Sequence, residues 1–141
     1  MNEPAPISRR RFLGGVACSL AAAGLPGCAA APVQRGLLRD DRLVLDLAAT
    51  RALMGDRPAI LVEAADSPLQ FILLRRGDAW RALSAVCTHQ NCQVRPQRHV
   101  LVCPCHGSTF DFDGRVTRGP APKALPAYRV EVGPDTLEIL L

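Results

Sequence analysis

Hydrophobic positions along the chain fall into short runs that suit β-strands better than helices. Residues 42–47 read RLVLDL and largely alternate between polar and apolar side chains, which is the period of a strand with one buried face. The runs 59–63, 69–75 and 80–86 are short and apolar, and proline, glycine or aspartate bounds them. No run from 42 to 141 has the length and period of a major helix. The pattern predicts an all-β fold of small stacked antiparallel sheets.

Turn-forming residues between these runs predict hairpins. Glycine beside aspartate or proline is a strong turn signal between two apolar runs. The expected hairpins join 69–75 to 80–86, 109–112 to 115–117, and 128–132 to 136–141, and one helical turn is expected at 50–54.

Composition divides the chain into three parts. Its 141 residues allow one modest domain and a leader. Residues 1–31 are assigned to the leader, 32–41 to a linker of proline, glutamine, glycine and mixed charge, and 42–141 to the folded domain. Aromatic residues make up 4% of the chain, so the core is expected to consist of leucine, valine and isoleucine.

Charge gives little information about partners, except that it argues against nucleic acid. The formal net charge is +4, part of which comes from three arginines in the leader. No basic run carries interleaved aromatic residues, so no nucleic-acid partner is expected. Arg95 and Arg98 are interpreted as solvated loop charges, and His99 as an exposed residue at the start of a strand.

The N-terminal segment resembles an export signal. Residues 8–13 read SRRRFL, which looks like a twin-arginine motif. The charge-free run 12–31 follows, interrupted by glycine and proline, and is poor material for a stable membrane helix. The twin-arginine route carries folded proteins, which suits a cofactor inserted before export. A periplasmic location is expected; the alternative is a basic flank before a signal anchor.

Residues 25–28 read LPGC and resemble a lipobox. Cys28 is therefore a candidate for lipidation and for the mature N-terminus, and the membrane would be reached only through the N-terminus. The alternatives are cleavage within 29–31 and retention of the leader as an uncleaved anchor.

Two short segments hold most of the cysteine and histidine. Residues 87–92 read CTHQNC and residues 103–108 read CPCHGS, which together contain four of the six cysteines and two of the three histidines. A packing core does not require paired cysteine and histidine at such offsets, so a metal site is predicted. Two thiolates and two imidazoles suit tetrahedral zinc, or a [2Fe–2S] cluster with two histidines on one iron. Each segment supplies both ligand types, which favours the cluster over zinc and over a bare disulfide scaffold.

These residues resemble the Rieske iron–sulfur signature, in the high-potential form of cytochrome bc-type complexes. The likeness covers about 80–132 and includes FD at 110–111, DG at 113–114 and GPAP at 119–122. It implies one [2Fe–2S] cluster, with the cluster loops at one end of the domain. By this resemblance Cys87 and Cys103 bind one iron, His89 and His106 bind the other, and Cys92 and Cys105 form a disulfide.

The resemblance also assigns residues around the cluster. Gly107 belongs to the second motif, Pro120 to a proline loop that covers the cluster, and the Ser108 hydroxyl can bond a bridging sulfide. Phe110 stands where respiratory members often have tyrosine, whose phenol donates a hydrogen bond to a ligand sulfur. Because such hydrogen bonds raise the potential, a lower potential is predicted than in relatives with tyrosine.

Two further departures lie between the motifs. The 13 residues from His89 to Cys103 are a few fewer than is usual in the family. Gln90 and Asn91 replace a common Leu-Gly pair. Asparagine is the best non-glycine residue for left-handed backbone, so the turn is expected to survive.

The resemblance implies a periplasmic electron carrier without catalytic residues of its own. It would pass one electron from a quinol or dehydrogenase to a c-type cytochrome or copper protein. The alternative is the iron–sulfur subunit of an oxidoreductase complex, either a quinol–cytochrome c reductase or the small subunit of a molybdenum oxidase such as arsenite oxidase, with the large subunit as partner. Oxidoreductase activity would then belong to the complex.

Overall fold

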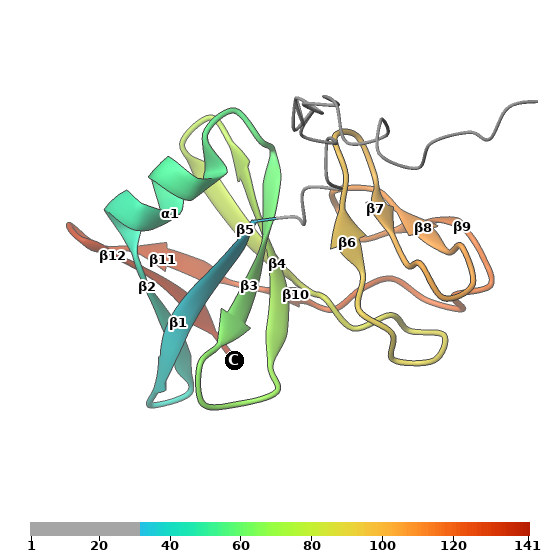
Figure 1. The fold of residues 1–141 in the computed structure, drawn as a ribbon, viewed down its shortest axis with the longest axis horizontal. Helices are drawn as coiled ribbons and strands as arrows, with labels where there is room; N and C mark the ends of the chain where they lie inside the picture. Colours follow the sequence, from blue (N-terminus) through green and yellow to red (C-terminus); the bar gives the residue numbers. More distant parts are fainter. Residues whose placement is uncertain (1–31) are drawn as a thin grey trace, which may run out of the picture.

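The computed structural model describes residues 32–141. The predicted leader, with its 8–13 motif and Cys28, lies outside the described residues. The described chain is mostly β-structure with one helix, as predicted (Figure 1). Its elements are β1 (Val33–Arg39), β2 (Arg42–Asp46), α1 (Leu47–Met54), β3 (Ala59–Ala64), β4 (Gln70–Arg76), β5 (Ala79–Ser84), β6 (Arg95–Pro96), β7 (Leu101–Val102), β8 (Thr109–Phe110), β9 (Val116–Arg118), β10 (Ala127–Tyr128), β11 (Val130–Val132) and β12 (Thr136–Leu140).

The strands form one sheet of eight and one of four. The larger sheet has the order β10-β5-β4-β3-β1-β2-β12-β11, and the smaller has the order β6-β7-β8-β9. Only Arg129 separates β10 from β11, although these strands lie at opposite ends of the larger order. The larger sheet must therefore curl until its two edges meet. Its pairs are antiparallel, as predicted, except that β1 pairs with β3 in parallel.

Strands β3 and β4 and the second half of β5 are buried on both faces, which explains their apolar runs. Ile60, Leu73 and Ala82 face the inside of the curled sheet, where α1 also packs through Leu47 and Met54. The opposite face carries a second core that reaches the four-stranded sheet. This second core contains Ala59, Leu61, Ile72, Leu74, Leu83, Ala85, Cys87, Val94, Leu101, Cys103, Phe110, Ala121 and Leu125.

The assignment of residues 32–41 to a linker is wrong. Residues Val33–Arg39 form β1, which lies between β2 and β3 in the larger sheet. The hydrophobic pattern does not show this strand, because Leu37 is 52% exposed whereas the one buried residue of β1 is Gly36. A strand whose buried residue is a glycine lacks the alternation of polar and apolar side chains by which a strand is predicted.

The predicted hairpins are present, with two local differences. The β4–β5, β8–β9 and β11–β12 pairs are all antiparallel. Helix α1 is longer than the predicted turn, because Asp46 caps it by accepting a hydrogen bond from Ala49 N at 2.6 Å. His99 lies in the turn before β7 rather than at the start of a strand, and it is exposed as expected.

Replacing Gly36 with alanine tests whether β1 belongs to the core sheet. A Cβ at this position would lie 2.6 Å from Leu45 Cδ2 and 2.8 Å from the Val44 carbonyl oxygen. We expect Gly36→Ala to lower the free energy of unfolding by about 1–3 kcal/mol, measured by urea denaturation. The control Arg35→Ala removes an exposed side chain of the same strand and should change stability by less than about 0.5 kcal/mol. Equal stability of the two variants would mean that residues 33–39 do not pack as described.

Candidate metal centre

The four-stranded sheet presents two loops that carry the predicted metal ligands. Loop 1 is residues 87–92 and follows β5, whereas loop 2 is residues 103–108 and follows β7. The short β6–β7 hairpin connects them, which accounts for the trimmed spacing between the motifs. A bridge between Val86 and Gln93 closes the base of loop 1, and Val94 N donates to Ala85 O at 2.7 Å. Both loops are thus anchored to strands of the second core.

The two loops have the same backbone hydrogen-bond pattern despite different sequences. In each loop, the N–H of the first cysteine donates to a carbonyl five residues later, and its carbonyl accepts from the N–H four residues later. The four bonds are Cys87 N to Cys92 O at 2.8 Å, Asn91 N to Cys87 O at 2.9 Å, Cys103 N to Ser108 O at 2.8 Å, and Gly107 N to Cys103 O at 3.0 Å.

Asn91 and Gly107 occupy equivalent left-handed positions in this pattern. Their φ angles are 57° and 75°. The expectation that asparagine preserves the turn is confirmed. A Cβ at Gly107 would meet no atom within 4 Å, so the backbone conformation rather than crowding favours glycine here.

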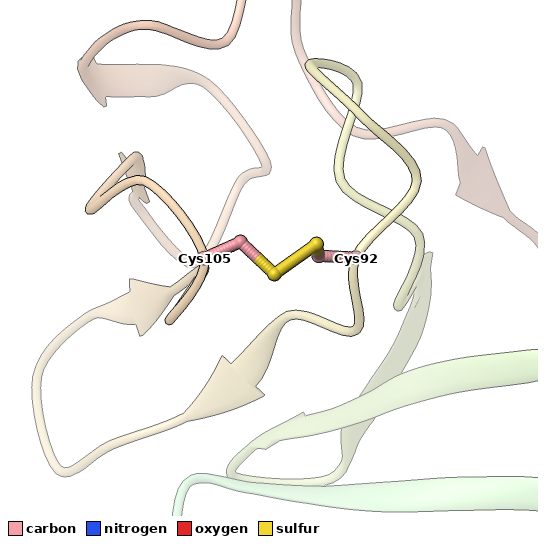
Figure 2. The surroundings of a disulfide bond; sticks show 2 residues. All are labelled: Cys92 and Cys105. Atoms are coloured by element: carbon pink, nitrogen blue, oxygen red, sulfur yellow. A yellow bond between two sulfur atoms is a disulfide. The ribbon is translucent and has the colours of Figure 1, made fainter.

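A disulfide between Cys92 and Cys105 joins the two loops, with an S–S distance of 2.06 Å (Figure 2). Each loop contributes one cysteine, as the resemblance implied. The sulfur atoms of Cys92, Cys103 and Cys105 lie within 4.8 Å of one another, so the disulfide stands directly beside a predicted ligand. It is not itself a ligand pair, because its sulfurs are bonded to each other.

Cys87 and Cys103 are free and buried. Burial raises the pKa of the Cys103 thiol, and its hydrogen bond with Cys87 raises this pKa further. Two neighbouring thiols in an apolar core do not ionise readily by themselves, but a bound metal deprotonates them. Their arrangement fits a thiolate pair that is completed by metal.

His89 and His106 come from different loops and lie against each other. Their ring centroids are 4.8 Å apart, and the rings are nearly perpendicular. His89 Nδ1 is buried and has no hydrogen-bond partner among residues 32–141. An unsatisfied buried nitrogen is costly unless a ligand occupies its lone pair. Together with the two buried thiols of the same loops, this donor set fits a [2Fe–2S] cluster with Cys₂ and His₂ ligands.

A third segment, residues 119–126, is bonded to both loops. Ser108 is fully buried, and its Oγ accepts a hydrogen bond from Ala121 N at 2.9 Å. Thr88 Oγ1 donates to Lys123 O at 2.7 Å. The segment contains Pro120, which is exposed. Sequence reasoning missed Thr88, whose signal was its place between Cys87 and His89 in the first motif.

Phe110 is 0% exposed and belongs to the same core cluster as Cys87 and Cys103. Its ring therefore helps to exclude water from the thiol side of the site. In contrast, the His106 side chain is exposed, so the histidine side faces solvent. The site is closed toward the protein and open at the loop end.

Comparison with known proteins identifies similar sequences. The Rieske [2Fe-2S] domain profile matches residues 45–129. The chloroplastic cytochrome b6-f complex iron-sulfur subunit of Pisum sativum is 40% identical over 90 residues, covering 62% of this chain and 35% of that protein. The corresponding subunit of Prochlorococcus marinus (strain MIT 9515) is 38% identical over 86 residues, covering 59% and 48%. The chain thus spans half or less of the length of these relatives.

Solved structures share the fold. The plasma membrane Rieske protein PetC3 from Synechocystis PCC 6803 superposes with a TM-score of 0.54 at 26% identity, covering 68% of this chain and 95% of that one. The structure of a carbazole 1,9a-dioxygenase oxygenase–ferredoxin complex contains a chain with a TM-score of 0.56 at 22% identity, which shows similarity of fold alone.

Removing the disulfide should destabilise the loop end of the domain. The bridge closes a segment with a sequence separation of 13, for which chain entropy predicts about 3 kcal/mol of stabilisation. We expect Cys92→Ser with Cys105→Ser to lower the unfolding free energy by up to this amount, measured by denaturation without reductant.

A phosphine reductant provides the control for this variant. It should bring the wild type down to the stability of the double variant and leave the variant unchanged. A wild type that keeps its stability after reduction would contradict a structural role for the bridge.

Proposed function

Since the chain belongs to the Rieske [2Fe-2S] family and binds one [2Fe–2S] cluster, we propose that it is an exported, membrane-attached carrier of single electrons. It would take them from a quinol or a dehydrogenase and deliver them to a c-type cytochrome or a copper protein. The observation that carries the proposal is a pair of buried free thiols on the same two loops as two histidines, one of which has a buried nitrogen without a partner in residues 32–141. Family membership also decides against the zinc and bare-disulfide alternatives.

We assign the ligands from the same observations. Within residues 32–141, Cys87 and Cys103 are the free cysteines, because the other two form the disulfide. They would hold one iron, and His89 and His106 would hold the other. When bound, the cluster exchanges one electron, at a potential raised by its two neutral imidazole ligands.

Protein groups around the site would control access to it. Phe110 and the second core exclude water from the thiol side, whereas the exposed His106 offers a redox partner a short route through its ring. The Ser108 oxygen already accepts from Ala121 N, so the hydroxyl hydrogen is free to point toward a bridging sulfide. The bond from Thr88 to Lys123 O holds the covering segment on loop 1.

A second candidate is a subunit of a membrane complex, because the curated relatives are cytochrome b6-f complex subunits. We favour the carrier because β1 begins at Val33, only five residues after the candidate anchor Cys28. A head that swings between two partners needs a longer hinge than this. Copurification of the native chain with a b-type haem protein would instead support the subunit.

Ligand substitution tests the site. We expect Cys87→Ser and His106→Asn each to abolish the Rieske-type EPR signal of the reduced full-length protein and to lower its iron and sulfide content. His99→Asn is the matched control, because this exposed histidine lies in the β6–β7 turn and should leave the signal unchanged. An unaltered signal in either ligand variant would refute the assignment, and an iron-loaded wild type without the signal would refute the function.

Restoring the family's tyrosine tests the role of Phe110. A hydrogen bond to a ligand sulfur that stabilises the reduced cluster by about 1 kcal/mol more than the oxidised cluster raises the midpoint potential of a one-electron couple by about 40 mV. We expect Phe110→Tyr to raise the midpoint potential by roughly this amount, measured by EPR-monitored redox titration.

Phe112→Tyr is the matched control for this variant. Phe112 is partly buried and packs at the edge of the same core, so the added hydroxyl should not move the potential. A potential that stays the same or falls in Phe110→Tyr would contradict the expected hydrogen bond.

A further inference from the structure

We propose that the end of the domain opposite the cluster loops is a docking surface for the anionic headgroups of a phospholipid bilayer, with Arg57 and Arg98 as its cationic contacts. The inference rests on the proposed membrane-attached function, because it assumes that the N-terminal segment holds the chain at a bilayer. It extends that function by fixing which way the cluster loops face.

The strand topology locates this surface. Strands β3 and β5 both pair antiparallel with β4, so they run in the same direction. The last residue of β5, Ser84, leads toward loop 1, whereas the first residue of β3, Ala59, lies at the other end of the sheet. Because β1 runs parallel to β3, the first residue of β1, which follows Pro32, lies at that same end of the sheet. The N-terminal junction is therefore remote from the cluster loops (Figure 1).

The same end carries an open hollow of about 1020 Å³. The 97–100 turn of the β6–β7 hairpin forms one side of the hollow. This turn lies at the end of the hairpin opposite the two cluster loops. The connection between α1 and β3 forms the opposite side. The lining residues are Pro32, Asp56, Arg57, Pro58, Ala59, Pro96, Gln97, Arg98, His99 and Phe112.

The two arginines of the hollow carry uncompensated charge. Arg57 and Arg98 are exposed, and no ion pair within residues 32–141 involves either of them. Arg57 Nη1 donates to the Leu53 carbonyl at 3.2 Å, which leaves its charge unneutralised. Among the described residues that line the hollow, Asp56 is the acidic one, and His99 adds a further polar group.

Some arginines elsewhere in residues 32–141 are neutralised by carboxylates. Arg81 lies 2.9 Å and Arg115 lies 3.4 Å from the Asp113 carboxylate, and Arg42 lies 2.9 Å from each of two glutamates. The hollow differs from these paired sites, and from unpaired exposed arginines such as Arg39 and Arg118, because it places two unpaired cations at a concave surface beside the N-terminal junction. Such a surface fits phosphate groups that approach from outside.

A bilayer is the occupant that the position of the hollow favours. Residues 29–32 separate Cys28 from β1, and four residues span at most about 14 Å. A chain anchored at Cys28 thus holds the hollow close to the headgroups at a high effective concentration. Each basic side chain next to a membrane attachment is attracted to anionic lipids.

This orientation selects the class of redox partner. With the hollow on the bilayer, the exposed His106 points away from the membrane into the aqueous compartment. The electron donor is then a dehydrogenase rather than a quinol held within the bilayer, and the acceptor is a water-soluble cytochrome or copper protein.

Vesicle binding of the full-length holoprotein tests the surface, with Cys28→Ser in every protein compared, so that a lipid on this cysteine does not fix the chain to the vesicle. We compare the double variant Arg57→Gln/Arg98→Gln with a control double variant, Arg39→Gln/Arg118→Gln, which removes two exposed arginines that lie outside the hollow and away from the N-terminal junction. We expect the wild type to bind vesicles of phosphatidylcholine and phosphatidylglycerol at least tenfold more strongly than vesicles of phosphatidylcholine alone. The hollow variant should lose most of this preference, whereas the control variant should keep it.

Oriented membrane multilayers provide a second measurement on the same proteins. The EPR signal of the reduced wild type should depend on the angle between membrane and field, and the hollow variant should lose much of that dependence. Equal lipid preference in all three proteins, or an EPR signal without orientation, would overturn the docking surface while leaving the electron carrier intact. Absence of any Rieske-type signal would instead overturn the proposed function.

Discussion

The burial of β3, β4 and the second half of β5 on both faces is the constraint on which the rest of the domain depends. One face of these strands packs in the interior of the curled sheet, and the other packs in the core that underlies the candidate metal centre. Hydrophobic burial is roughly proportional to apolar area, so a strand that buries both faces stabilises both halves at once. Cys87 and Cys103 belong to this second core, and their thiols are therefore positioned by ordinary packing.

Loop 1 and loop 2 have the same backbone hydrogen-bond pattern although their sequences differ. Equivalent hydrogen bonds shape both loops, and Asn91 and Gly107 supply the same left-handed turn. The disulfide and the 119–126 segment then hold the loops against each other. Rigid support of this kind keeps ligands in place through a redox change, since preorganised sites need little rearrangement.

Much of the fold and the site could be predicted because their signals are local. Apolar runs bounded by turn residues marked the strands, and the grouping of cysteine with histidine marked the centre. Strand β1 was missed because its buried contact is Gly36, which leaves no hydrophobic pattern. Its parallel pairing with β3 depends on contacts distant in the chain, and the role of Thr88 depends on Lys123, 35 residues away. Such relations are not encoded in local spacing.

The position of β1 also has a mechanical consequence. Its first half, residues 33–36, pairs with β3 and its second half, residues 37–39, pairs with β2, and the strand begins at the N-terminal junction. A pull on the chain from that junction acts along the strand and loads many of its hydrogen bonds together, in shear. A terminal hairpin pulled outward would instead release its bonds one after another. The domain is thus built to bear tension from the side on which its N-terminal segment joins it.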